Sequence, residues 1–229
     1  MMAQPEEPGH RAGVSDLPQQ ANLQNQKIGE EKASLRLSLR AKRKALSSTF
    51  RLSADAAMTS HFIDAYRGTG EINVGLYAPV GTEVCTAGFA ELLRELGART
   101  YYPRLQADEL SLDFVLSDRP VEEFSLGAYQ IPEPEGPGLS ADKMDLILLP
   151  GLGFDRAGGR LGQGKGCFDR ALRDYNGLCA GLTYTCQIVD TVPMLEHDRP
   201  IDILFSESGV EWASKKAEAL FLIEGGETG

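Results

Sequence analysis

The sequence has few of the residues that build metal centres and disulfide frameworks. Among its 229 residues are only four cysteines and three histidines. The cysteines form no C-x-x-C pair and have no companion histidines at metal-ligand spacing; they are Cys85, Cys167, Cys179 and Cys186. Structural zinc is therefore not expected. The pattern fits a protein whose thiols stay reduced.

The chain also lacks a secretory signal and a long apolar run. Its N-terminus has no positively charged start followed by an apolar segment, and no run approaches the length needed to span a bilayer. We expect a cytoplasmic protein without a membrane partner.

Positive charge is scarce as well. The sequence has 23 Lys and Arg against 33 Asp and Glu, a formal net charge of −10. Nucleic acid is therefore not an expected partner, because binding it requires a broad basic surface. Residues 32–51 are the exception, with seven basic residues and no acid. Leucines near helical spacing predict a helix with a cationic face, where Lys32 and Arg36 lie at i and i+4. A solvated surface is the simpler interpretation for most of these cations.

Strand and helix patterns alternate along most of the chain and predict an α/β fold. Residues 1–28 are rich in Gln, Pro and Gly and are interpreted as a disordered leader, residues 29–212 as one domain, and 213–229 as a tail. Expected helices cover 32–51, 53–66 with Ser53 as N-cap, 86–96 and 168–175. Expected strands cover 72–77, 99–102, an exposed or edge strand at 110–116, 145–149, 178–184 and 201–206. The last of these precedes a short extension at 209–212, and 117–143 is mostly loop. The fold class is an open, mostly parallel Rossmann-like sheet flanked by helices.

The most informative segment is LILLPGLGFDRAGGRLGQGKGCFDR, which begins at Leu146. An apolar run typical of a buried parallel strand leads into a segment with five glycines within residues 158–166. Glycine allows backbone N–H groups to turn toward an anion, and Arg160 and Lys165 add positive charge. Because ligands of open parallel sheets bind beyond the carboxyl ends of strands, this loop predicts a phosphate site, most simply for a nucleotide.

Two common glycine motifs match poorly. The G-x-x-x-x-G-K pattern over 159–165 begins a Walker A loop, but Gly166 stands where a magnesium-binding Ser or Thr is required. A Rossmann fingerprint should follow its strand directly, whereas here the G-x-G-x-G lies about a dozen residues downstream.

The full pattern resembles the 5-formyltetrahydrofolate cyclo-ligase family, also called methenyltetrahydrofolate synthetase. The resemblance rests on the central segment, on KASLR at 32–36, on LYAPVGTEVCT at 76–86 and on LEHDRPIDILFSE near the end. It spans roughly residues 30–210.

The resemblance implies an enzyme that uses ATP and Mg²⁺ to convert 5-formyltetrahydrofolate into 5,10-methenyltetrahydrofolate, ADP and phosphate. Its partners would be these small molecules, and we expect a monomer. The implied catalytic residues are Lys165 and Arg160. The implied ATP-binding residues are Lys32, Arg36, Arg160, Leu161, Gly162, Gln163, Gly164, Lys165, Gly166 and Phe168. The implied substrate-binding residues are Val80, Glu83, Cys85 and Cys167, and the implied metal ligands are Asp169 and Asp198.

From the residues alone, Asp169 also suits the first turn of a helix and Asp198 a turn at the end of a loop. Asp155 is a further carboxylate candidate that could instead shape the loop. His197 is interpreted as a surface neighbour rather than a base.

Two positions depart from the family pattern. Cys167 stands where an aromatic residue commonly packs against the pterin, and Cys85 stands where an acid often assists binding, which leaves Glu83 as the nearby carboxylate. Two alternatives therefore stay open. One is a diverged enzyme that transfers phosphate to another small substrate, and the other is a nucleotide-binding protein without turnover.

Overall fold

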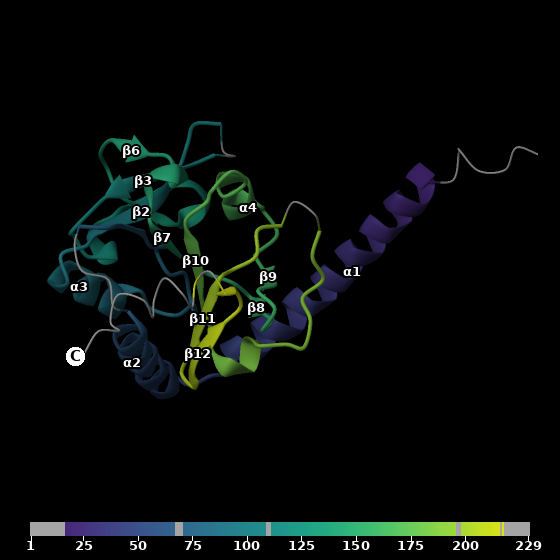
Figure 1. Ribbon diagram of the computed structural model, residues 1–229, viewed down its shortest axis with the longest axis horizontal. Helices are drawn as coiled ribbons and strands as arrows, with labels where there is room; N and C mark the ends of the chain where they lie inside the picture. The colour runs from purple at the N-terminus through teal and green to yellow at the C-terminus, as the bar shows by residue number, and fades with distance from the viewer. Residues whose placement is uncertain (1–16, 67–70, 109–110, 196–197, 216, 218–229) are drawn as a thin grey trace, which may run out of the picture.

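The computed structural model describes residues 17–66, 71–108, 111–195, 198–215 and 217. Within them, an eight-stranded sheet has the order β12-β11-β10-β7-β1-β2-β3-β6 and lies between helices (Figure 1). The strands of this sheet are β1 (Asn73–Gly75), β2 (Arg99–Leu105), β3 (Leu112–Leu116), β6 (Gly138–Leu139), β7 (Leu146–Leu149), β10 (Leu178–Leu182), β11 (Ile203–Ser206) and β12 (Gly209–Trp212). The helices are α1 (Leu17–Lys44), α2 (Ser48–Ala65), α3 (Ala87–Glu95) and α4 (Cys167–Ala171).

The centre of the sheet is parallel. Strands β11, β10, β7, β1 and β2 run in one direction, whereas β12 at one edge and β3 and β6 at the other end of the sheet pair antiparallel with their neighbours. This confirms the predicted mostly parallel, helix-flanked α/β fold. No helix among the described residues is long and apolar enough to cross a membrane.

The predicted central strand is β7, which is buried along its whole length. Leu146 and Leu148 belong to the core cluster that includes Phe62 of α2, on one face of the sheet. Ile147 and Leu149 belong to a second cluster on the other face, beneath α4. Alternate side chains of a strand point to opposite faces, so both core layers hold β7 in place.

The N-terminal helices differ from the prediction. The predicted helices covered 32–51 and 53–66. The junction between the two observed helices lies earlier in the chain, because α1 ends at Lys44 and α2 begins at Ser48. The N-cap is Ser47, whose hydroxyl accepts the Phe50 N–H at 3.1 Å, and the predicted cap Ser53 lies inside α2. Either serine has the chemistry of a cap, and pattern alone did not choose between them.

The expected leader is also partly helical. Residues 1–16 lie outside the described residues, while 17–28 form the beginning of α1. This part of α1 extends away from the body of the molecule (Figure 1). Its side chains from 22 to 27 are exposed, so it carries no core pattern by which the sequence could reveal it.

Several boundaries in the rest of the chain also differ. Strand β2 continues through Pro103 to Leu105, beyond Tyr101, where its ladder with β1 ends. The missing N–H of Pro103 therefore costs no bond to β1. Strand β3 is not the edge strand, because β6 pairs with it. Helix α4 is shorter than the expected 168–175.

Short elements occupy the expected loop at 117–143 and the glycine segment. They are the paired strands β4 (Ser125–Leu126) and β5 (Pro132–Glu133), the hairpin of β8 (Gly153–Phe154) and β9 (Arg160–Leu161), and single 3₁₀ turns at Val121–Glu123, Ala128–Gln130 and Ala141–Lys143. A further 3₁₀ turn follows β10 at Thr185–Gln187. The β8–β9 hairpin was not predicted. It places the glycine loop, residues 158–166, against α1, where Leu39 packs with Leu161 and Val192.

Candidate functional site

The glycine loop is shaped by Asp155. One carboxylate oxygen of Asp155 accepts the N–H of Ala157 at 2.9 Å and of Gly159 at 2.8 Å, and the other accepts the Val192 N–H at 2.7 Å. A Cβ on Gly159 would collide with this carboxylate. The structure thus gives Asp155 the shaping contacts that its position suggested.

Gly166 turns the loop into α4. It is the N-cap residue of α4 and has φ 67°, a left-handed conformation that favours glycine. This explains why a glycine, rather than the Ser or Thr of a Walker A loop, stands before Cys167.

The loop borders a cleft of about 510 Å³ beyond the carboxyl end of β7. A cleft of this size lies within the range of small-molecule sites. Predicted residues that line it are Val80, Glu83, Arg160, Gly162, Gln163, Lys165, Gly166, Cys167, Phe168 and Asp169. The opposite wall includes Pro103, Leu105, Leu112, Tyr129, Ile131 and Glu133. The predicted nucleotide and substrate segments therefore face the same space.

Arg160 is anchored inside the cleft wall. Its guanidinium forms an ion pair with Asp169 at 2.5 Å and donates to the Pro150 carbonyl at 3.3 Å. Its carbon Cζ lies 6.0 Å from the centre of the Phe168 ring. The Arg160 Nε is buried and has no hydrogen-bond partner among the described residues. Burying such a donor costs free energy, which is a common feature of sites built for a ligand rather than for stability.

Lys165 is exposed and is held differently. Its ammonium lies over the ring of Tyr129, 2.7 Å from the ring centre. Tyr129 and its neighbour Gln130 have φ values of 59° and 58°, an uncommon left-handed conformation for residues other than glycine. A surface lysine on an aromatic face keeps its mobile charge available at the cleft.

Helix α1 supplies the remaining predicted cations. The Arg36 Nε donates to the Gly162 carbonyl at 2.9 Å. Lys32 forms an ion pair with Asp198, and Asp198 also accepts the Leu195 N–H at 2.7 Å. Neither Lys32 nor Asp198 is among the residues that line the cleft, so both stand behind the loop rather than within the site.

The predicted metal ligands are consequently in different places. Asp169 lines the cleft and offers the carboxylate oxygen that Mg²⁺ prefers. Asp198 is paired with Lys32 and would reach a cation only after that pair separated. No group of three or more His, Cys, Asp or Glu side chains in the described ranges could hold a metal by itself. The residues fit an ion bound mainly through nucleotide phosphates, with Asp169 as the protein ligand.

The predicted substrate-binding residues also lie in different places. Glu83 is nearly buried, and its carboxylate accepts the Val80 N–H at 3.0 Å. Cys167 lines the cleft, with its sulfur 3.6 Å from Arg170 Nη2. Cys85 is exposed and is not one of the residues lining the cleft. His197 lies outside the described residues.

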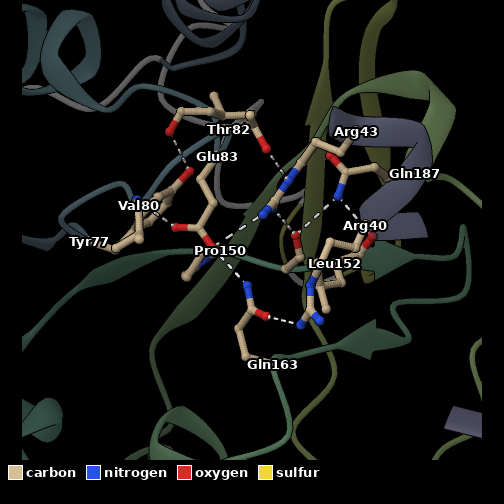
Figure 2. Close-up of polar contacts among 12 residues, drawn as sticks. Arg40, Arg43, Tyr77, Val80, Thr82, Glu83, Pro150, Leu152, Gln163 and Gln187 are labelled. Carbon is tan, nitrogen blue, oxygen red and sulfur yellow. Dashed lines mark hydrogen bonds and ion pairs between the residues drawn. The ribbon is translucent and has the colours of Figure 1, made fainter. Parts of the chain in front are cut away.

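Two α1 residues and one loop residue were missed by sequence reasoning. Arg40 donates to the Gln163 side chain, and the buried Arg43 lies 3.8 Å from the Glu83 carboxylate (Figure 2). The sequence did contain a signal for Arg40 and Arg43, because residues 32, 36, 40 and 43 are spaced so that they lie on one face of a helix. Tyr129 had no such signal, because only the folded chain brings it to the cleft.

Two titratable groups near the site are excluded from proton transfer. Burial raises the pKa of the Tyr77 hydroxyl well above its ordinary value, and the nearby Glu83 raises it further. Tyr77 instead donates to the Val84 carbonyl at 2.9 Å. Burial also raises the pKa of the Cys179 thiol to about 12. Both groups stay neutral and serve packing.

Comparisons with known proteins agree on one family. A family model described as the 5-formyltetrahydrofolate cyclo-ligase family matches residues 28–207. The 5-formyltetrahydrofolate cyclo-ligase of Mus musculus is 29% identical over 195 residues, which cover 79% of this chain and 96% of that protein. The Escherichia coli K12 protein of the same name is 30% identical over 146 residues, covering 61% and 80% of the two chains.

A solved structure has the same fold. The NMR structure of 5,10-methenyltetrahydrofolate synthetase from Aquifex aeolicus superposes with a TM-score of 0.68 and 30% identity, covering 80% of this chain and 92% of that one. The residues matched by the family model, 28–207, include the larger part of α1, the glycine loop and the cleft wall.

Proposed function

Because the chain belongs to the 5-formyltetrahydrofolate cyclo-ligase family, we propose that this enzyme converts 5-formyltetrahydrofolate into 5,10-methenyltetrahydrofolate, with cleavage of ATP to ADP and phosphate. The product contains a new carbon–nitrogen bond, and the reaction is therefore that of a cyclo-ligase.

One observation carries the proposal. A phosphate-type loop with Arg160 and Lys165 faces the Val80–Glu83 segment across a single cleft. An ATP-dependent ligase needs its nucleotide and its second substrate in contact, because the phosphoryl acceptor must lie in line with the γ-phosphate.

In the first proposed step, the formyl oxygen of the substrate attacks the γ-phosphorus and ADP leaves. An amide-like oxygen is a poor nucleophile, so positioning and charge neutralisation must supply the acceleration. Lys165 and Arg160 would neutralise the charge that develops on the transferred phosphoryl oxygens, and the N–H groups of the glycine loop would add dipoles. Asp169 would hold the Mg²⁺ ion that accompanies ATP and offsets phosphate charge, and Asp198 would join it only if its pair with Lys32 separated.

In the second proposed step, N10 of the folate attacks the activated carbon and closes the ring, the phosphate leaves, and the N10 proton is lost to that phosphate. The protein contributes by holding the folate against the cleft wall. Leu105, Leu112, Ile131 and Phe168 offer apolar surface for the ring system, and Glu83 offers a carboxylate to its polar edge.

Cys167 is the observation that favours a second candidate. It lines the cleft at the position where an aromatic residue commonly packs in the family, so a related enzyme that phosphorylates a different small acid or amide is the alternative.

Incubation with Mg-ATP and 5-formyltetrahydrofolate, following methenyl product and ADP together, tests the proposal. Formation of both in equal amounts is expected. ADP without methenyl product would indicate the diverged enzyme, and neither product would indicate a nucleotide-binding protein without turnover.

A further inference from the structure

The carboxylate of Glu83 is held from two different parts of the molecule (Figure 2). One oxygen accepts the backbone N–H of Val80, within the loop that carries Glu83. The other lies 3.8 Å from Arg43 Nη1 and accepts the side-chain Nε2 of Gln163 at 3.2 Å. Every interaction named here involves a cation or an N–H donor, so the contacts define one orientation of the carboxylate.

Arg43 is a rigid support. Its side chain is 7% exposed, its Nη1 donates to the Gly151 carbonyl at 3.2 Å, and its Nε donates to Thr82 at 3.2 Å. Gln187 donates to the same Gly151 carbonyl at 3.2 Å. Gly151 is the second residue after β7, so Arg43 ties Glu83 to the core of the sheet.

Gln163 is a support of a different kind, because it belongs to the glycine loop. Its amide oxygen accepts Arg40 Nη2 at 2.9 Å. Arginine can only donate, so the Gln163 amide nitrogen must face away from Arg40, toward Glu83. The next residue on one side, Gly162, is held by Arg36 through its carbonyl. The position of the Gln163 amide therefore depends on the conformation of the loop.

We propose that Gln163 is a positioning residue that couples the two substrates: when the glycine loop binds nucleotide, Gln163 orients Glu83 and raises the affinity of the cleft for the folate. The inference rests on the proposed function and adds to it that the affinities for the two substrates are coupled. The bond from Gln163 of the glycine loop to the Glu83 carboxylate favours both bound ligands only when both segments are in place. Such coupling is reciprocal, so each ligand raises the affinity for the other by the same factor.

Calorimetric titration with 5-formyltetrahydrofolate, with and without saturating Mg²⁺ and a non-hydrolysable ATP analogue, measures the coupling. For the wild-type enzyme, the Kd of the folate should fall about fivefold or more when the analogue is bound, at the lower end of typical coupling between two sites. The Kd of the analogue should fall by the same factor when the folate is bound.

Gln163→Leu keeps the size of the side chain but removes its donor and acceptor. The ratio of the two folate dissociation constants should then lie within about twofold of unity, whatever happens to the separate affinities. The matched control is Gln26→Leu, the same change at an exposed position of α1 whose amide contacts Glu30, and it should keep the wild-type ratio.

A double-mutant cycle shows whether Gln163 acts through Glu83. In a Glu83→Leu background, adding Gln163→Leu should leave the ratio of that background unchanged, because the acceptor of the bond is already absent. Equal effects of Gln163→Leu in both backgrounds would overturn the inference, as would a wild-type ratio in Gln163→Leu. If the wild-type enzyme turns over the folate but the ratio of its two folate dissociation constants is near one, the inference alone is overturned. If the wild-type enzyme does not turn over the folate, the proposed function is overturned as well.

Discussion

At the scale of single residues, the two loop cations that face the cleft are held very differently. Arg160 is buried in a pair with Asp169, while Lys165 is exposed over Tyr129. The first can act only from a fixed place, and the second can move toward a phosphate. We infer that Lys165 supplies the mobile charge in phosphoryl transfer.

Lys165→Ala should therefore lower kcat by about 10²- to 10³-fold, the range expected for loss of one charge-stabilising donor. The free energy of unfolding should stay within about 0.5 kcal/mol of wild type, because the side chain is exposed. Steady-state kinetics and urea unfolding measure the two quantities. Lys143→Ala is the control, since Lys143 is exposed and pairs with Asp142 away from the cleft. Near wild-type turnover in Lys165→Ala would remove Lys165 from the mechanism.

Cys167 is a weak point of the predicted substrate-binding surface. The thiol offers little surface to a ring system, which leaves Tyr77, Tyr129 and Phe168 as the aromatic side chains that line the cleft. Cys167→Tyr should lower the KM for 5-formyltetrahydrofolate roughly two- to tenfold, corresponding to the 0.5–1.5 kcal/mol of an aromatic contact. The KM for ATP, measured in the same assays, should not change. An equal or higher folate KM would contradict this role for position 167.

Predicted site residues that are close together in the chain also lie together in the structure. Ten predicted positions line the cleft, because the glycine loop and the Val80–Glu83 segment are each local in the chain. Predictions that needed contacts between distant segments were less complete. Asp198 is paired with Lys32, and Cys85 is exposed outside the cleft lining.

At the scale of elements, α1 is the part whose role changed most. The sequence showed a basic helix with a solvated face, whereas the structure buries Leu39 against Leu161 and Val192 and places Arg36, Arg40 and Arg43 on the loops of the cleft. The helix therefore supports the glycine loop from behind as well as offering charge.

Leu39→Ala should destabilise the protein by about 2–5 kcal/mol, because Leu39 is 0% exposed and its removal leaves a cavity under the loop. Leu37→Ala is the matched control on the same helix. Leu37 is 69% exposed, and its replacement should change the free energy of unfolding by less than about 0.5 kcal/mol. Urea unfolding of both variants gives the comparison. Equal effects would show that the packing of α1 on the loop contributes nothing to stability.

Boundaries of elements were harder to predict than their existence. Strand β7 lies where continuous apolarity predicted it, whereas the segment expected only as a short extension at 209–212 forms strand β12. The junction of α1 and α2 was misplaced because Ser47, Ser48 and Ser53 are chemically equivalent caps, and packing decides among them. The β8–β9 hairpin depends on Asp155 accepting N–H groups from two segments, a contact that local pattern does not encode.

At the scale of the whole molecule, the cleft is bordered by α1, the ends of β7 and β2, and the β4–β5 region, so a ligand there contacts much of the fold. A ligand that binds only the folded state stabilises it by about 2.7 kcal/mol at one hundred times its Kd. For a chain of this length, that corresponds to roughly 5–10 °C in Tm.

Mg-ATP at such a concentration should therefore raise Tm by roughly 5–10 °C, and addition of 5-formyltetrahydrofolate should raise it further. Thermal unfolding followed by intrinsic fluorescence checks both shifts. Mg²⁺ alone is the control and should have little effect, since no cluster of three metal-ligating side chains occurs in the described ranges. A shift with ATP but none with folate would favour the alternative substrate.

The sequence alone determined the alternating strands and helices, the buried central strand and the glycine loop with its two cations. These features follow from local causes: side-chain periodicity, the freedom of glycine and the length of apolar runs. The tertiary structure decided which distant groups meet, and therefore the site itself. Arg43 beside Glu83, Gln163 between Arg40 and Glu83, Lys165 over Tyr129 and Lys32 against Asp198 all join segments far apart in the chain. Such pairs depend on the path of the folded backbone, because no local pattern records which segments it brings together.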